Sequence, residues 1–457
     1  MTGVSDGNGV AAIQEYLAGH RAQMLALLEA LVRAESPTDV PTAQAEVQSI
    51  LGRLLRSLGY AVQRVDGGEG NADHLYARPS QRDRARPVQL LVGHCDTVWP
   101  RGTIREMPFV VEGEKVRGPG VFDMKGGLVQ MLFALAALRG ASIEPPVVPV
   151  VFINSDEERG SPTSQRHLVR LARCAHRAFV LEPALGLDGK IKTARKGAGR
   201  FTVRIEGKSA HAGLDPESGS SAILELSHVV QALHALNDRE AGISVNVGTI
   251  DGGTRPNVVA DAGMAEVDVR IETHEQARRV EDAIRGLEAS TAGTSLHIEG
   301  GIGRPPMTPG PAARRLWAQA QQAAAQLDLH LGAGRSGGVS DGNLISQHTP
   351  TLDGLGPVGD GAHARHEFCY VDRMVERSAL LALLLALLLA CLLFSVPTLS
   401  RCGARVLTLC ELNIRKCRLH VLCVLCVVCV YVLRDLIYLF MHSSILSGIL
   451  SARCISR

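Results

Sequence analysis

A histidine and an aspartate stand two residues apart directly after Val88–Gly93, an apolar segment typical of a buried strand. Because the side chains of a strand alternate between its two faces, His94 and Asp96 are expected to point to the same side. A metal-bound imidazole needs its second nitrogen held by an acceptor, and a carboxylate at this spacing can provide one. The pair is a candidate metal ligand with its orienting acid, although this spacing alone is more often structural.

A single carboxylate, Asp123, lies in the glycine-rich turn Gly118–Gly127. Its two oxygens could bridge two cations. It could equally cap the helix that the pattern predicts to begin near Met124. The turn therefore adds a candidate ligand and leaves its role open.

Three further segments end in residues that bind cations. The strand predicted at Val147–Asn154 runs into Asp156-Glu157-Glu158, whose adjacent negative charges are costly without a cation. Glu182 ends another short apolar strand, and His363 follows Pro350–Gly356, which is predicted to be a strand. Singly, the acids could form a solvated loop and His363 could be a surface residue. Five such pieces at strand ends together predict a site for divalent cations.

The elements that carry these pieces alternate between strands and helices. Apolar strand patterns and helical patterns occupy 10–33 (helix), 42–58 (helix), 88–93 (strand), 124–138 (helix), 147–154 (strand), 165–171 (helix) and 178–181 (strand). This alternation predicts an α/β domain with a mostly parallel sheet and helices on both faces.

A second pattern begins near Arg195, where apolar residues alternate with polar ones, as in Phe201, Val203 and Ile205. A helix is predicted at 220–236, between two such strands. We expect an inserted small α+β domain at 195–304, with the first domain formed by 1–194 and 305–390.

The composition changes again in the final segment, 391–457, which is rich in leucine and cysteine. Eight of the 11 cysteines fall in the last 70 residues, and apolar runs occupy 379–396 and 420–441. The first run could be a final buried helix or a membrane span, since about 18 apolar residues are nearly long enough to cross a bilayer. Charges at Arg434 and Asp435 disfavour a second span, so we expect the tail to be dispensable.

Composition excludes some classes of function. The net charge is only +2 and aromatic residues make up 4% of the chain, which argues against a nucleic-acid partner. Residues 1–30 lack the pattern of a secretory signal, and only three cysteines precede residue 380. These features predict a cytoplasmic protein, with membrane association through the tail as the alternative.

Taken in order, the candidate ligands resemble the dinuclear-zinc peptidase family that includes bacterial glutamate carboxypeptidase, the aminoacylases, acetylornithine deacetylase and succinyl-diaminopimelate desuccinylase. The resemblance covers roughly residues 15–378. It implies two zinc ions per subunit, for which Co²⁺ or Mn²⁺ can substitute, and Asp123 as the bridging ligand. The other metal ligands that it implies are His94, Glu158, Glu182 and His363. It further implies that Glu157 is the general base and that Asp96 orients His94.

The resemblance also implies a substrate. The segment Asp156–Ser161 and the acid Glu182 look most like the glutamate carboxypeptidase branch. That branch implies hydrolysis of an amide next to a free carboxylate, with release of a glutamate-like C-terminal residue from a small N-acylated amino acid or dipeptide-like substrate. An N-acyl-amino-acid deacylase, similar to acetylornithine deacetylase, is the alternative.

The small domain resembles the family's dimerisation lid, which implies a homodimer. His211 matches the histidine that reaches the active site, commonly that of the partner subunit. Asn257 and Arg270 match the substrate-binding pair, and the planar fork of an arginine suits a carboxylate. Backbone groups of Gly337 and Gly338 are expected to complete the pocket. One departure is His366, which stands where relatives often have Asn or Asp.

Overall fold

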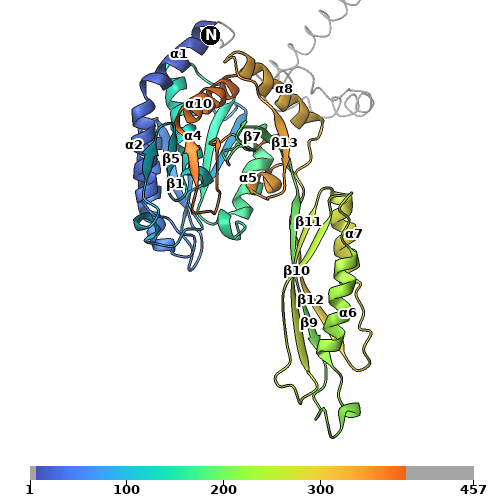
Figure 1. Cartoon of the computed structure of the whole chain (residues 1–457). Helices are drawn as coiled ribbons and strands as arrows, with labels where there is room; N and C mark the ends of the chain where they lie inside the picture. The colour runs from blue at the N-terminus through green and yellow to red at the C-terminus, as the bar shows by residue number, and fades with distance from the viewer. Residues whose placement is uncertain (1–6, 388–457) are drawn as a thin grey trace, which may run out of the picture. The chain divides into compact units, whose positions relative to one another are not determined.

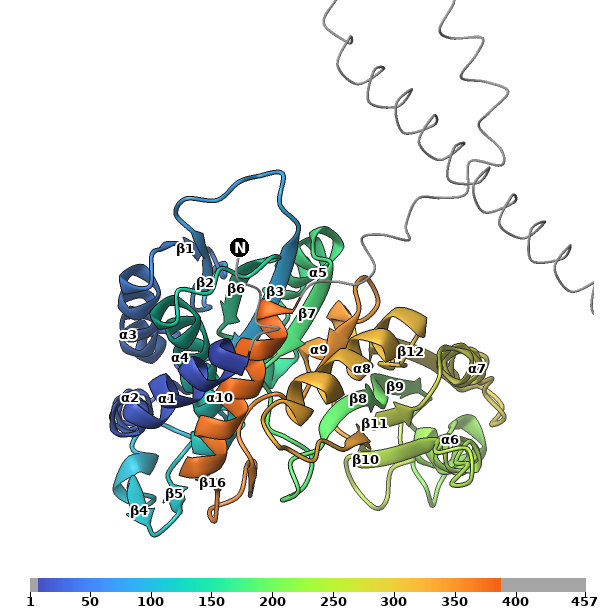
Figure 2. The same cartoon turned by 90° about the horizontal axis from the view of Figure 1, so that it is seen from above.

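The computed structural model describes residues 7–387, and the predictions for 391–457 therefore lie outside the described residues. The described chain is mixed α/β, which confirms the predicted fold class (Figures 1 and 2). The described residues belong to one unit.

The main sheet has six strands in the order β1-β2-β6-β3-β7-β14. Their bounds are β1 Tyr60–Val65, β2 His74–Pro79, β3 Val88–His94, β6 Val148–Asn154, β7 Arg177–Val180 and β14 Thr351–Leu352. The strands β6, β3, β7 and β14 are parallel to one another. At one edge of the sheet, β2 pairs antiparallel with both β6 and β1. The carboxyl ends of the parallel strands therefore meet at one edge of the sheet, where sites of α/β proteins gather.

Both faces of this sheet are covered by helices. Alternate residues of β3 enter different cores: Leu91 packs with the helices on one face, whereas Leu90 and Val92 pack on the other. The first face carries α1 Gly7–Gly19, α2 Arg21–Arg33, α3 Gln44–Ser57, α4 Gly126–Gly140, α8 Pro311–Ala325 and α10 Val371–Ala386. The second carries α5 Gln165–Cys174 and α9 Asp341–Ile345 (Figure 2).

One predicted helix and one predicted strand need correction. The single helix expected over 10–33 is two helices, because the chain turns at His20, whose Nδ1 hydrogen-bonds to the Tyr16 carbonyl oxygen at 2.7 Å. The strand expected at 350–356 is only the two residues of β14.

The apolar run that begins at Ala379 forms the end of α10 as far as Ala386. This part is buried against α4, as in a core helix, and the run beyond Leu387 lies outside the described residues. Within the described range, one helical stretch, Val121–Gly140, is long and apolar enough to cross a membrane, but 83% of its apolar window is buried inside the protein.

Residues 197–304 contain a sheet and a core of their own. The antiparallel strands are ordered β10-β11-β9-β12, with bounds β9 Gly197–Glu206, β10 Ser244–Gly252, β11 Ala262–Ile271 and β12 Ser295–Arg304 (Figure 1). The helices α6 Ala222–Ala235 and α7 His274–Arg285 bury their apolar faces on this sheet. A capping box formed by Thr273 and Gln276 begins α7. This segment is called the lid below.

Smaller elements complete the fold. The strand β8 (Ile191–Arg195) pairs in parallel with β13 (Ala333–Ser336). A four-stranded sheet follows the order β15-β16-β5-β4, with bounds β4 Val110–Glu112, β5 Lys115–Arg117, β15 Gly359–Asp360 and β16 Phe368–Tyr370. Short helical turns occur at η1 Pro41–Ala43, η2 Thr103–Arg105, η3 Val121–Lys125, η4 Glu157–Arg159 and η5 Pro216–Ser218.

Candidate metal centre

His94 is the last residue of β3, and its side chain is almost fully buried. Its Nδ1 lies 3.0 Å from the backbone oxygen of Asp96 and 3.4 Å from the carboxylate of the same residue. Both are acceptors, so Nδ1 donates to them, and Nε2 faces Asp123 at 3.2 Å and Glu182 at 3.5 Å. Burial lowers the pKa of His94, but its hydrogen bonds with Asp123 and Asp96 raise that pKa well above its usual value.

Asp96 connects His94 to the acidic run after β6. Its Oδ1 and Oδ2 accept hydrogen bonds from the backbone N–H groups of Glu157 (3.3 Å) and Glu158 (3.2 Å), and Oδ2 also accepts one from Thr38 Oγ1 at 2.9 Å. A buried carboxylate in this position fixes both the imidazole and the turn η4.

The first acid of that run has a structural role. Asp156 accepts hydrogen bonds from the backbone N–H and hydroxyl groups of Thr163 and Ser164, which stabilises the start of α5. These hydrogen bonds hold the pKa of Asp156 below its usual value, although burial acts in the opposite direction. Glu157 and Glu158 are left to face the candidate site.

Asp123 lies in η3, where its own backbone is not helical. Its Oδ1 faces His94, and its Oδ2 lies 3.5 Å from Nε2 of His363. One carboxylate therefore spans two imidazoles, which is the geometry required of a bridging ligand. The alternative, that Asp123 caps a helix, is not supported, because no side-chain cap is formed at the start of either η3 or α4.

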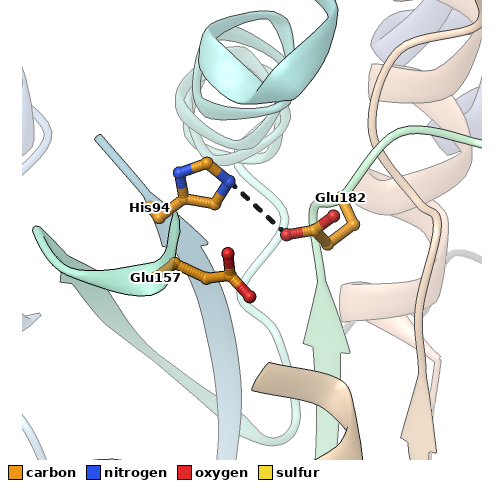
Figure 3. Close-up of side chains that lie close together, drawn as sticks. All are labelled: His94, Glu157 and Glu182. Atoms are coloured by element: carbon orange, nitrogen blue, oxygen red, sulfur yellow. Dashed lines mark ion pairs between the residues drawn. The ribbon is translucent and has the colours of Figure 1, made fainter. Parts of the chain in front are cut away.

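Glu182 follows β7 and is nearly buried. Its Oε1 faces His94, and its Oε2 lies 3.6 Å from the Arg195 guanidinium, which is itself held by Asp353 at 2.7 and 3.0 Å. Figure 3 shows His94, Glu157 and Glu182 pointing toward one another around a common space.

His363 lies on the loop between β15 and β16 and is about half exposed. Its Nε2 is 3.1 Å from Oε2 of Glu158, and hydrogen bonds with Asp123 and Glu158 raise the pKa of His363 to about 10. His366 is exposed and makes no ion pair with an acid among the described residues. Geometry therefore favours His363 over His366 as the residue that faces the acids.

The basic groups near this cluster do not balance the negative charges of its acids. Burial, followed by repulsion from Glu182 and Asp341, raises the pKa of Glu157 well above its usual value. Burial and the charge of Asp123 raise the pKa of Glu182 to about 7, and burial also raises the pKa of Glu158. Such an arrangement is typical of a site that holds cations.

The donor atoms fit a pair of divalent metal ions. Two groups, His94–Glu157–Glu182 and His94–Asp123–Glu158, each place their ligand atoms within 4.8 Å of one another. Oε1 of Glu158 is buried without a hydrogen-bond partner, which a metal ion would provide. Imidazole and carboxylate donors are the types that zinc accepts. Geometry alone does not separate Glu157, the expected base, from a ligand.

The three lid residues lie apart from this cluster. Asn257 accepts a backbone hydrogen bond from Ala212, next to His211, so those two residues occupy adjacent segments. Arg270 is bound by Asp268 of its own strand at 2.8 and 3.0 Å. Within residues 7–387, no hydrogen bond or ion pair joins His211, Asn257 or Arg270 to the metal-site acids.

The exposed pair Gly337 and Gly338 follows β13. The Gly338 oxygen accepts a hydrogen bond from Arg195 at 3.0 Å, which connects this loop to the guanidinium beside Glu182. The role of Arg195 was not predicted from sequence. The signal available was weak, because β8 reads Ile-Lys-Thr-Ala-Arg and carries a second cation, Lys192.

Comparison with known proteins identifies the family. Residues 90–387 match the profile of Peptidase family M20/M25/M40. The chain belongs to this family. It is therefore a metallopeptidase or amidohydrolase of the M20 group, as the sequence indicated.

Two relatives show the range of activities. The chain is 28% identical to carboxypeptidase G2 of Pseudomonas sp. over 344 residues, which cover 74% of this chain and 82% of that protein. It is 29% identical to succinyl-diaminopimelate desuccinylase of Alkalilimnicola ehrlichii over 363 residues, which cover 76% and 93% of the two chains.

Solved structures share the fold. The aminopeptidase PepT of Bacillus cereus has a TM-score of 0.66 at 23% identity and covers 82% of this chain and 98% of its own. YXEP of Bacillus subtilis, described as a dinuclear metal-binding peptidase of family M20, has a TM-score of 0.58 at 15% identity, with 81% and 98% covered.

Proposed function

We propose that this M20 enzyme is a dinuclear zinc hydrolase that cleaves an amide next to a free carboxylate and releases a glutamate-like C-terminal residue. The observation that carries the proposal is the convergence of His94, Asp123, Glu158, Glu182 and His363 on one buried space at the carboxyl edge of the sheet. The similarity to carboxypeptidase G2 supports the choice of substrate.

The proposed ligand sets share Asp123. One ion would be held by His94 and Glu182, and the other by Glu158 and His363. When bound, the two ions supply Lewis acidity, which lowers the pKa of water toward neutrality and polarises the amide carbonyl. Cobalt and manganese are expected to support the same chemistry.

Glu157 is proposed to move the proton. Its carboxylate points into the same space as His94 and Glu182, while its backbone N–H is held by Asp96 (Figure 3). It accepts a proton from the attacking water and delivers it to the nitrogen of the leaving amine. Burial and the nearby Glu182 carboxylate raise its pKa well above the usual value, which favours uptake of a proton by this carboxylate.

His211 is proposed to stabilise the developing oxyanion of the tetrahedral intermediate. Its Nδ1 accepts hydrogen bonds from the backbone N–H groups of Gly213 (3.1 Å) and Leu214 (3.2 Å). The proton of the neutral ring therefore resides on Nε2, which is free to donate to an oxyanion. Arg270, with Asn257 and the Gly337–Gly338 loop, is proposed to bind the substrate carboxylate.

A homodimer is proposed to bring His211 to the site of the partner subunit. The strand β10 is an edge strand of the lid sheet, and large apolar side chains are exposed on the lid. Ile250 on β10 is 63% exposed and Leu214 is 82% exposed, while Ile223 and Leu224 on α6 are each about half exposed. An unpaired edge beside exposed apolar residues is suited to association with a second copy.

An amine-release assay with added zinc tests the proposed substrate. The panel contains N-acylglutamates, folates, N-acetylornithine and N-succinyl-diaminopimelate, with α-carboxamide analogues of the glutamates as matched controls. We expect the highest kcat/KM for substrates with a C-terminal glutamate and a large loss for the carboxamides. A preference for N-acetylornithine or N-succinyl-diaminopimelate would instead support the deacylase alternative.

Location in the cell remains part of the proposal. The cytoplasmic prediction rests on residues 1–30 and on the scarcity of cysteine before residue 380. The alternative, attachment to a membrane through 391–457, concerns residues outside the described range.

A further inference from the structure

Glu367 is a fully buried carboxylate that the proposed reaction does not use. Its Oε1 accepts hydrogen bonds from the backbone N–H groups of Phe122 (2.9 Å) and Asp123 (3.0 Å). Its Oε2 accepts hydrogen bonds from the Gly120 N–H group and from Trp99 Nε1, both at 2.9 Å. Each oxygen therefore binds two donors.

These four donors come from two segments that carry metal-site residues. Trp99 lies on the segment that follows β3, three residues after Asp96. Gly120, Phe122 and Asp123 form the turn that presents the bridging carboxylate. Glu367 itself ends the loop that carries His363.

The His363 loop depends on this anchor. Gly361 and His363 both have positive φ, 85° and 60°, and successive turns close from Ala364 to Gly361 and from Glu367 to Ala364. Gly361 and Glu367, at the two ends of the loop, are buried, whereas the His363 side chain is half exposed. The acids that face His363 are Asp123 and Glu158, so the loop must be held in place for its ring to reach them.

We propose that Glu367 is a positioning residue, which sets the distances among His94, Asp123 and His363 by joining the three segments that carry them. It does not touch substrate or the reacting atoms. The inference rests on the proposed zinc site. Zinc affinity then depends on the Glu367 carboxylate, although that group is not a zinc ligand.

Glu367→Gln tests this role with little change in volume. An amide has one acceptor oxygen, so its NH₂ group would face two of the four donors whichever way it is oriented. We expect zinc affinity of the weaker site to fall by about 10- to 100-fold, the usual effect of removing a group that orients a ligand. Competition with a fluorescent chelator on metal-free protein measures this affinity.

Glu225→Gln is the matched control. Glu225 is also a buried carboxylate that accepts backbone hydrogen bonds, from Ser290 at 3.1 Å and Thr291 at 2.6 Å, but it belongs to the lid. Both variants are expected to lower the thermal midpoint of the metal-free protein. Only Glu367→Gln is expected to lower zinc affinity, and high zinc concentrations are expected to restore most of its kcat.

The outcomes separate the inference from the proposed function. Two zinc ions bound equally tightly by wild type and folded Glu367→Gln would overturn the positioning role while leaving the metal site intact. Failure of wild type to bind zinc would overturn the proposed function itself. If Glu367→Gln does not fold, Trp99→Phe tests the inference instead, because it removes one of the hydrogen-bond donors to the Glu367 carboxylate. Its zinc affinity is expected to fall several-fold, and an unchanged affinity would contradict the inference.

Discussion

Replacing Asp96 with Asn removes one acceptor from a site where both carboxylate oxygens are in use. Oδ1 accepts the Glu157 N–H group and Oδ2 accepts the Glu158 N–H group. Whichever oxygen becomes NH₂, one of these buried backbone donors loses its partner. Leaving a buried donor unpaired costs about 1–3 kcal/mol.

That cost applies to the turn that holds both the proposed base and a proposed ligand. At about 1.4 kcal/mol for each factor of ten, kcat/KM or zinc affinity is expected to fall about 5- to 150-fold. Amine-release kinetics and zinc titration, run side by side, measure the two quantities. Thr38→Ala is the control, because it removes the hydroxyl that contacts Oδ2 and the Thr97 oxygen but leaves the hydrogen bonds from the Glu157 and Glu158 N–H groups in place; a smaller loss is expected. Asp96→Asn with wild-type kcat/KM and wild-type zinc affinity would refute the reasoning.

Four other predictions can be tested. The pKa of His363 is raised to about 10 by hydrogen bonds with Asp123 and Glu158, so zinc binding at pH 8 must displace a proton from this ring. Calorimetry in buffers of different ionisation enthalpy is expected to show at least one proton released, and an equal release from His363→Ala would contradict this. Because folding raises the pKa of His363, the protonated ring stabilises the metal-free protein. This stabilisation is complete below about pH 6.5 and is lost as the pH rises through about 10. Mixing inactive His211→Ala with inactive Glu157→Ala is expected to restore part of the activity in mixed dimers, whereas no recovery despite verified subunit exchange would place His211 in its own subunit or outside the reaction. A chain ended after Ala390 is expected to fold and remain active, because it keeps the buried end of α10 and the Leu387 oxygen that accepts a hydrogen bond from Arg177; loss of activity on truncation would show that the tail is needed.

Local patterns in the sequence predicted the main elements because burial leaves a periodic trace in the chain. The segments at 88–93 and 147–154 are mostly apolar and form the central strands β3 and β6. Since parallel strands end at a common edge, the residues that follow them could be placed together before the fold was known. The break at His20 was missed because apolar spacing continues across it on both sides.

Contacts between distant segments left no such trace. Glu367 accepts a hydrogen bond from Trp99 across 268 residues, and Arg195 binds Asp353 across 158. In each case the sequence shows a charged residue without indicating its partner. The same limit applies to Arg270, whose bidentate contact with Asp268 means that a substrate carboxylate must share or displace that acid. The roles assigned to His211, Asn257 and Arg270 therefore remain predictions.

The division of roles between Glu157 and Glu158 is the central claim, because each of these carboxylates has an oxygen within 4.8 Å of a ring nitrogen of His94. Glu157→Gln, analysed for bound zinc and for turnover on the best substrate of the panel, tests it most directly. If Glu157 transfers protons and Glu158 binds metal, the variant retains about two zinc ions per chain while kcat falls by about 10²- to 10⁴-fold. Loss of a zinc ion from Glu157→Gln, or near-normal turnover with both ions bound, would contradict the account.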